Sequence, residues 1–146
     1  MKIRFKRISI LFIIISSVLA SRCSKDPQDT TDWPQYLGPH RNSISDQKGL
    51  LRSWPEKGPK VLWTAGLGTG FGGAVIRDGK VYVLDRDDEV GDYIRCYDLA
   101  NGKELWNYGY SAPGRVRFHG SRGMPALDGN YIYSCGHNGD LYCIDI

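Results

Sequence analysis

The residues best suited to chemistry lie close together near the end of the 146-residue sequence, in the stretch CGHNGDLYC. This stretch holds four possible ligands for zinc or copper: Cys135, His137, Asp140 and Cys143. The dipeptide Asn138-Gly139 predicts a two-residue hairpin turn, because both central positions of such a turn need a positive φ. The resulting register sets Cys135 opposite Tyr142, so that Cys135 and Cys143 point to opposite faces of the sheet. The four side chains then do not converge, and we expect neither a metal site nor a disulfide here.

Three cysteines follow the N-terminal region, and an odd number cannot all pair within one chain. They are Cys96, Cys135 and Cys143. We expect all three to behave as small buried hydrophobic residues.

A glycine-rich stretch, GLGTGFGG, has the spacing of a dinucleotide-binding fingerprint at Gly68, Gly70 and Gly73. That fingerprint requires a helix directly afterwards, because the helix N-terminus binds the phosphate. The residues that follow, AVIRDGKVYV, instead predict a strand and a turn. We therefore interpret the match as accidental and the stretch as a flexible turn that leads into a strand.

A basic stretch, GRVRFHGSRG, carries Arg115, Arg117, His119 and Arg122. Such a cluster could meet an acidic cofactor or substrate, although a solvated basic loop is the simpler interpretation. Neither His40 nor His119 belongs to a recognisable pair of nucleophile and base. Neither a His-Glu-x-x-His nor a Gly-x-Ser-x-Gly motif occurs. We therefore predict no catalytic residue and no metal ligand, and cofactor-binding residues stay unknown.

The N-terminus has the pattern of a secretory signal peptide over residues 1–22. Four basic residues precede a mostly apolar run at residues 8–19: Lys2, Arg4, Lys6 and Arg7. The run is short for a membrane span, which needs about 20 residues. We therefore expect the chain to be exported.

Cys23 lies just after the apolar run, and this arrangement resembles a bacterial lipoprotein signal, whose cysteine receives a lipid. Arg22 departs from that pattern, and the small residues that end at Ala20 suit plain signal cleavage. Lipidation of Cys23 and plain cleavage therefore both stay open. Residues 23–32 form a polar tether in either case, and the predicted location is the periplasm or the outer membrane.

The basic character of the sequence belongs mostly to the signal. The formal charge of +3 falls to −1 once the four cations that precede the apolar run are removed. A near-neutral chain lacks the basic surface of a nucleic-acid-binding protein, so we exclude that class of partner. Contact with a membrane is expected only through the signal or a lipid anchor.

The rest of the sequence predicts strands. Residues 33–59 form an irregular segment rich in proline and glycine, called here the lead-in segment. From residue 60 onward we expect a strand at KVLWTA and then two strands around the turn at Asp78-Gly79. Strands at YIRCYDL and KELWNYGY follow on either side of a turn at Asn101-Gly102. The last residues, 124–146, predict three strands joined by an Asp-Gly and an Asn-Gly turn.

The predicted strands form a repeat. Cys96-Tyr97-Asp98 corresponds to Cys143-Ile144-Asp145, Asp78-Gly79 corresponds to Asp128-Gly129, and KVLW corresponds to KELW. The spacings of about 43 to 50 residues, with four short strands per unit, are typical of propeller blades.

The stretch CYDLANGKELW resembles the phrase that closes each blade in pyrroloquinoline-quinone (PQQ) propeller repeats, Ala-x-Asp-x-x-Thr-Gly-Lys-x-x-Trp. Four residues fall on that pattern: Asp98, Gly102, Lys103 and Trp106. Cys96 replaces the alanine and Asn101 the threonine. The stretch DWPQYLGPHRNSIS is also similar to the opening sequence of the quinoprotein alcohol dehydrogenase-like superfamily. The resemblance covers residues 32–146.

This resemblance implies an all-β fold, a β-propeller of four-stranded PQQ-like blades. About two blades would occupy residues 60–146, so that the ring is incomplete and the sequence corresponds to an N-terminal fragment. The stretch PKVLW would supply the strand that closes the ring. Trp63 and Trp106 would bury their indole rings between blades.

Two functions follow from the resemblance. The first is an exported scaffold of the bacterial cell envelope, similar to the propeller lipoprotein of outer-membrane assembly, which binds a protein or a small ligand and is inactive as a fragment. The second is the N-terminal part of a quinoprotein alcohol dehydrogenase, with PQQ and calcium bound only in a complete propeller. Several of those enzymes carry adjacent cysteines beneath the cofactor, and this sequence has none. We favour the scaffold.

Overall fold

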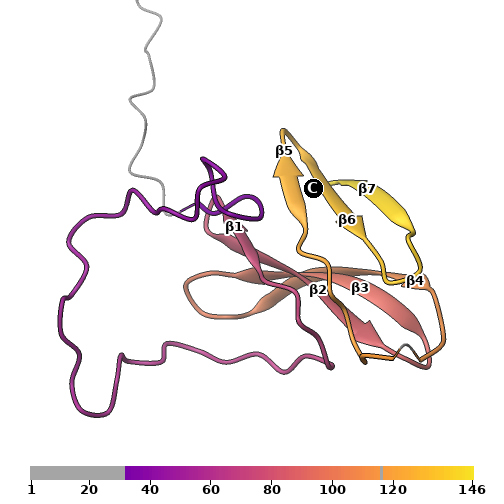
Figure 1. Cartoon of the computed structure of the whole chain (residues 1–146), viewed down its shortest axis with the longest axis horizontal. Coiled ribbons are helices and arrows are strands. Elements are labelled where there is room, and N and C mark those ends of the chain that lie inside the picture. Colours follow the sequence, from indigo (N-terminus) through magenta and orange to yellow (C-terminus); the bar gives the residue numbers. More distant parts are fainter. Residues whose placement is uncertain (1–31, 116) are drawn as a thin grey trace, which may run out of the picture.

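The computed structural model describes residues 32–115 and 117–146, and these residues form two antiparallel sheets with no helix among them (Figure 1). The first sheet has four strands in the order of the chain: β1 (Val75–Arg77), β2 (Lys80–Asp87), β3 (Gly91–Asp98) and β4 (Glu104–Ser111). The second sheet has three: β5 (Ala126–Asp128), β6 (Tyr131–Cys135) and β7 (Leu141–Asp145). The predicted fold class, all-β with two successive blades of an incomplete ring, is confirmed. Within the described part of the chain, no helix is long and apolar enough to cross a membrane.

The turns that the sequence predicts in the first sheet are present. Asp78 and Gly79 have φ values of 51° and 71°, and they join β1 to β2 with Arg77 paired to Lys80. Between β3 and β4 the Asp98 carboxylate accepts the backbone N–H groups of Ala100 and Asn101 at 2.9 and 3.1 Å. These short-range bonds satisfy the backbone where the ladder ends, which is why Asp and Gly recur at these positions.

The main core lies between the two sheets. Its buried members come from both: Val75, Tyr82, Leu84, Ile94, Cys96, Leu127 and Ile132. Trp106 packs against this cluster, and its ring centroid lies 5.9 Å from that of Tyr82. Trp106 therefore packs between the blades, as predicted. Cys96 is fully buried, which confirms its predicted role as a small hydrophobic residue.

The other face of the first sheet carries a smaller cluster of Val81, Val83 and Tyr97, covered by Trp63. The Trp63 ring stacks on Tyr97 with centroids 6.4 Å apart, and its indole N–H donates to the Leu99 carbonyl at 2.8 Å. The prediction of a strand at residues 60–65 is wrong, because this segment forms no ladder with any described strand. It crosses the face of the sheet instead of extending its edge, so the backbone has no neighbour with which to pair.

The predicted register of the last hairpin is also wrong. Cys135 pairs with Leu141 and not with Tyr142, so that five residues, 136–140, form the turn. Gly139 has a φ of 90°, but Asn138 lacks the positive φ that a two-residue turn of this kind requires. The turn closes through a bond from the Gly136 N–H to the Asp140 carbonyl at 2.8 Å.

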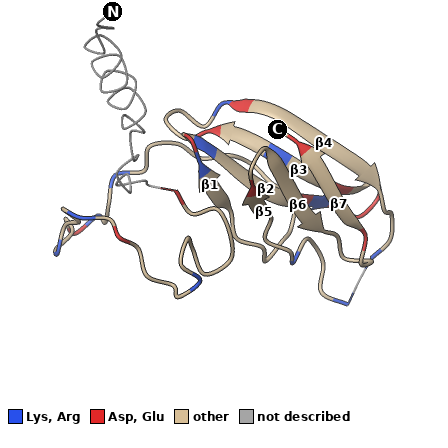
Figure 2. Cartoon of the chain, turned by 90° about the horizontal axis from the view of Figure 1, so that it is seen from above, with Lys and Arg blue, Asp and Glu red and all other residues tan. Residues whose placement is uncertain are grey.

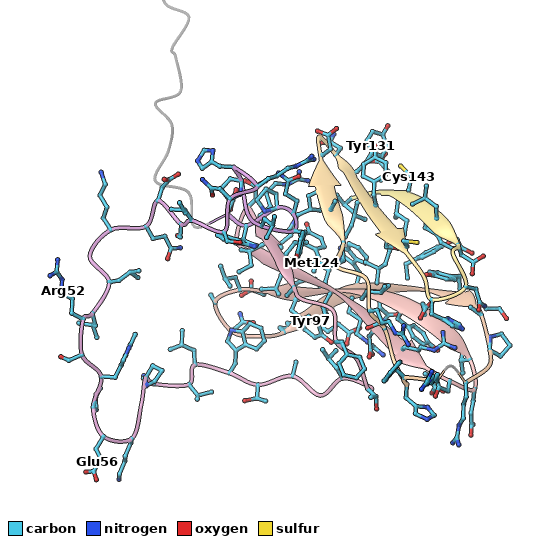
Figure 3. All side chains as sticks on the ribbon, in the orientation of Figure 1. Arg52, Glu56, Tyr97, Met124, Tyr131 and Cys143 are labelled. Atoms are coloured by element: carbon cyan, nitrogen blue, oxygen red, sulfur yellow. The ribbon has the colours of Figure 1, made fainter. Side chains whose placement is uncertain are left out.

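The shift of one residue turns the cysteines of the second sheet to the same face. Cys135 and Cys143 both lie on the face of the second sheet that points away from the core, together with Tyr133 and Leu141. Figure 3 shows Cys143 and Tyr131 projecting from this outer face, whereas Met124 lies between the sheets. Both cysteines are exposed and free, so the prediction that they are buried is wrong.

The lead-in segment touches the first strand of each sheet. The N–H and carbonyl groups of Trp33 bond to Ile76 in β1 at 2.8 and 3.0 Å. The next carbonyl, that of Pro34, accepts the N–H of Leu127 in β5 at 2.9 Å. Two consecutive residues thus connect the first strands of both sheets.

Candidate functional site

The loops that connect the blades lie together at one end of the two sheets. Residues 66–73 lead into β1, and residues 112–125 lead from β4 into β5. Their backbones meet where Gly70 forms a parallel bridge to Ser121 and the Phe71 N–H donates to the Ser121 carbonyl at 2.7 Å. We call the surface formed by residues 66–73, 88–90, 112–115 and 117–123 the connecting face.

The glycines of residues 66–73 permit this close approach. A Cβ at Gly70 would lie 2.7 Å from the Ser121 hydroxyl, and a Cβ at Gly72 would overlap the Gly123 carbonyl. The segment continues into the strand β1 and not into a helix, so it presents no helix N-terminus to a phosphate. Gly68 thus allows close approach to the Arg86 backbone, Gly70 to Ser121 and Gly73 to the Met124 side chain.

Asp85 anchors the glycine-rich loop to the first sheet. Its Oδ1 accepts the Gly68 N–H at 2.8 Å, and its Oδ2 accepts Arg95 Nε at 2.7 Å. Arg95 is half-buried and also reaches Glu104 at 3.2 Å. Burial opposes the charge of Arg95, but the hydrogen bond to Asp85 and the nearby charges of Asp85 and Glu104 together outweigh it and raise the pKa of Arg95.

Arg86 anchors the second loop, and its side chain is fully buried. Its guanidinium donates to Asp88 Oδ1 at 2.8 Å and to Asp92 Oδ1 at 3.0 Å. It also donates to the carbonyls of Ala112 and Gly114 at 2.9 and 2.6 Å. Burial opposes the charge, yet the hydrogen bonds to Asp92 and Asp88 and the charges of these carboxylates together raise the pKa of Arg86. Arg86 therefore fixes the start of the loop at residues 112–114.

The Asp88 carboxylate links the buried Arg86 to a residue at the surface of the loop. Its Oδ2 lies 2.9 Å from Nδ1 of the exposed His119, while its Oδ1 accepts Arg86. The hydrogen bond with His119, followed by that with Arg86, lowers the pKa of Asp88. The loop is thus held at its start by Arg86 and further along by the His119–Asp88 pair.

Three arginines of this loop remain exposed: Arg115, Arg117 and Arg122. The guanidinium carbons of Arg117 and Arg122 lie 5.8 and 5.1 Å from the centroid of the Phe118 ring, within the range of cation–π contact. Phe118 is 56% exposed and Phe71, on the neighbouring loop, is 69% exposed. Figure 2 shows basic residues on both sides of the grey residue 116 in this loop. Among the described residues, no carboxylate forms an ion pair with any of these three arginines.

The four possible metal ligands of the last hairpin are not brought together. The His137 side chain is 4% exposed, and its Nδ1 lies 3.7 Å from Asp92 Oδ2, whereas Cys135 and Cys143 lie on the exposed face. Over residues 32–115 and 117–146, no group of three or more His, Cys, Asp or Glu side chains is placed to hold a metal ion. His137 instead packs at the contact between the two sheets.

Asp92 lies where the second sheet approaches the first, and it accepts polar groups of its own sheet. Besides Arg86 it accepts the Tyr110 hydroxyl at 3.2 Å, and a Cβ on Gly136 of the second sheet would lie 2.6 Å from its Oδ2. Burial first, and then the nearby charge of Asp92, raises the pKa of Tyr110. The Tyr110 ring also stacks on Tyr142 of β7, with centroids 3.8 Å apart.

Sequence reasoning missed Arg86 and Asp92 as a buried pair. The signal was present in VYVLDRD, where charged residues continue an apolar strand without a turn residue between them. A charge at a buried strand position needs a partner within the fold, so an arginine there predicts a nearby carboxylate.

Two other predicted residues lie elsewhere. Cys23, the candidate for lipidation, lies outside the described residues. His40 belongs to the lead-in segment, where its Nε2 lies 2.7 Å from Asp46 in an exposed pair. Neither residue takes part in the connecting face.

Comparison with known proteins gives one family. The family model described as outer membrane protein assembly factor BamB, a model of PQQ-type repeats, matches residues 41–146. The matched range covers both sheets and the connecting face. No curated protein and no solved structure matches the chain.

Proposed function

The chain belongs to the PQQ-like repeat family whose model is described as outer membrane protein assembly factor BamB, and from this premise we propose that it is an exported binding module of the bacterial cell envelope. It holds a protein or a small ligand without transforming it. The family match over both blades is the observation that carries this proposal. Location in the periplasm or at the outer membrane, through the signal or a lipid on Cys23, is part of the same proposal.

The geometry of the connecting face supports a binding role. The buried charges at this face are engaged in holding loops: Asp85 binds the Gly68 N–H, and Arg86 binds the carbonyls of Ala112 and Gly114. Loops held in this way lose little conformational entropy when a partner binds, which favours affinity. Their exposed tips carry the aromatic and arginine side chains that are enriched at binding surfaces.

The alternative from the sequence is the N-terminal part of a quinoprotein alcohol dehydrogenase. The described residues fit its cofactors poorly, because they offer no cluster of three carboxylate, histidine or cysteine groups for calcium. The sequence also lacks adjacent cysteines. We therefore derive no step through a quinone, and this alternative stays a prediction.

Export and lipidation can be tested together in cells. The full chain, with a C-terminal epitope tag, is expressed in a bacterium with two membranes and labelled with an alkyne analogue of palmitate. We expect the tagged chain in the envelope fraction, with label lost in Cys23→Ala and kept in the matched variant Cys135→Ala. Recovery of an uncleaved chain from the cytosol would contradict the proposal. An exported chain without label would support export but contradict lipidation of Cys23, and plain signal cleavage would then be the outcome.

A further inference from the structure

The connecting face combines exposed arginines with exposed aromatic rings on two loops that are held against each other. Phe71 and Phe118 come from different loops, and the bond from the Phe71 N–H to the Ser121 carbonyl fixes the distance between the loops. Arg117 and Arg122 both lie within cation–π distance of Phe118. Arg122 Nη2 also donates to the Phe118 carbonyl at 3.4 Å. The other N–H groups at the edges of these guanidiniums can bind a carboxylate.

These three arginines have no acidic partner among the described residues, in contrast to Arg86 and Arg95. His119 differs from them, because it is paired with Asp88. The loop therefore presents three cations, Arg115, Arg117 and Arg122, whose charge is not used within the described fold. Their charge favours a partner with carboxylates, and the two phenylalanines favour apolar side chains beside those carboxylates.

The neighbouring turn restricts the kind of partner. Asp87 and Glu89 are exposed, and the turn that holds them is bonded to the basic loop from Gly114 N–H to the Asp88 carbonyl at 2.9 Å. Two carboxylates beside the arginines would repel a uniformly anionic surface such as a phospholipid bilayer or a nucleic acid. A peptide can place its own charges one by one, so a protein segment fits this mixed surface best.

We propose that the connecting face binds an extended segment of a partner protein, in which carboxylate side chains alternate with apolar ones. Carboxylates of the segment bind Arg117 and Arg122, and its apolar side chains contact Phe71 and Phe118. This inference rests on the proposed binding function and names the surface and the class of partner.

The test measures binding of synthetic peptides to the full chain by fluorescence anisotropy. The probe is a fluorescein-labelled peptide of repeated Glu-Phe-Gly units, and peptides of equal length with Lys-Phe-Gly or Glu-Ser-Gly units are the comparisons. We expect the Glu-Phe-Gly peptide to bind most tightly, with an affinity that falls as salt is added. Equal binding of the Lys-Phe-Gly peptide would overturn the proposal.

Charge reversal locates the site. In Arg117→Glu/Arg122→Glu the Kd for the Glu-Phe-Gly peptide is expected to rise about tenfold or more, because attraction becomes repulsion. The matched variant Arg52→Glu/Lys57→Glu makes the same change of charge on the exposed lead-in segment, which Figure 3 shows far from the sheets at Arg52. It is expected to leave the Kd within about twofold. An equal loss in both double variants would overturn the proposal.

A milder variant guards against misfolding, and two further probes distinguish other ligands. Arg117→Gln/Arg122→Gln removes the two charges without reversing them. This variant should also raise the Kd for the Glu-Phe-Gly peptide, while its circular dichroism spectrum stays unchanged. The two probes are phosphatidylglycerol vesicles and single-stranded RNA. If either probe binds as tightly as the peptide, and if the arginine variants abolish that binding, the choice of a protein segment is overturned. An exported chain that ignores the peptide refutes only this inference, whereas a cytosolic chain that binds it refutes only the export proposal.

Discussion

The buried guanidinium of Arg86 gives the sharpest test of how this fold is held together. Arg86→Met keeps much of the side-chain volume but removes every hydrogen bond that the guanidinium makes. Asp92 is fully buried, so its carboxylate would lose its cationic partner without gaining water. The carbonyls of Ala112 and Gly114 would lose their donor as well.

The expected loss of stability follows from these contacts. Breaking a buried ion pair from one side destabilises a protein by about 3–5 kcal/mol. The whole free energy of unfolding of a domain is about 5–15 kcal/mol, so this loss is a large part of it. The Arg95→Met variant is the control, because Arg95 is 24% exposed and its partner Asp85 keeps the N–H groups of Gly68 and Arg86 as donors. Its loss should be about 1 kcal/mol.

Urea unfolding followed by tryptophan fluorescence measures both variants on the full chain. With a slope of about 1–3 kcal/mol per molar urea, Arg86→Met should lower the midpoint by about 2 M. Adding Asp92→Asn to Arg86→Met removes the unpaired charge. The double variant should regain about 1–3 kcal/mol of the free energy of unfolding, because the effects of substitutions at contacting residues are coupled by about that amount.

The reasoning fails if Arg86→Met is no more destabilising than Arg95→Met. It also fails if Asp92→Asn gives no recovery in the Arg86→Met background, because the loss would then not come from a stranded carboxylate. In either case the loop at residues 112–114 would be held by other contacts.

Three further predictions concern the turns, the tyrosines and the cysteines. Gly102→Ala should destabilise the fold by about 2 kcal/mol in urea titrations, since Gly102 has a φ of 72° and a Cβ there would overlap the Trp63 ring. Gly139→Ala is the control, because Gly139 has a φ of 90° but open space around it, and its free energy of unfolding should fall by only about 1 kcal/mol. Burial raises the pKa of Tyr82 from 10.0 to about 12, so stability should be intact below pH 10 and fall as the pH rises toward 12. Tyr82→Phe should flatten that fall in urea midpoints measured across this pH range, and an unchanged slope would contradict the assignment. A maleimide reagent, mapped by peptide mass spectrometry, should spare Cys96 in the native chain and modify two other cysteines, Cys135 and Cys143; native labelling of Cys96 would contradict the packing between the sheets.

The sequence predicts the features that depend on short-range chemistry. The Asp78-Gly79 turn needs only two residues that tolerate a positive φ, and it is where the sequence places it. Trp106 follows from its place in the repeated phrase, and it packs between the sheets as expected. Local patterns of this kind are independent of what the rest of the chain does.

The features that the sequence missed depend on contacts between distant residues. The last hairpin adopts a five-residue turn in which Gly136 fits against Tyr110 and Asp92 of the first sheet, and the local preference of Asn138-Gly139 does not decide its register. Residues 60–65 have a strand-like composition, but Trp63 binds the Leu99 carbonyl on a sheet face. The connecting face was recognised in part, because its arginines were visible in the sequence whereas the buried Arg86 that anchors them was not.

The contacts of Trp33 and Pro34 have a consequence for the order in which the chain folds. Trp33 pairs with Ile76, whereas Pro34 completes its hydrogen bond only with Leu127, much farther along the chain. The conformational entropy lost in closing so long a loop comes before the contact can stabilise the fold, and this order slows folding. The bond of Pro34 therefore cannot form until β5 has been made. For a chain proposed to leave the cytoplasm, late formation of this contact between the two sheets favours passage through an export channel before the sheets are joined.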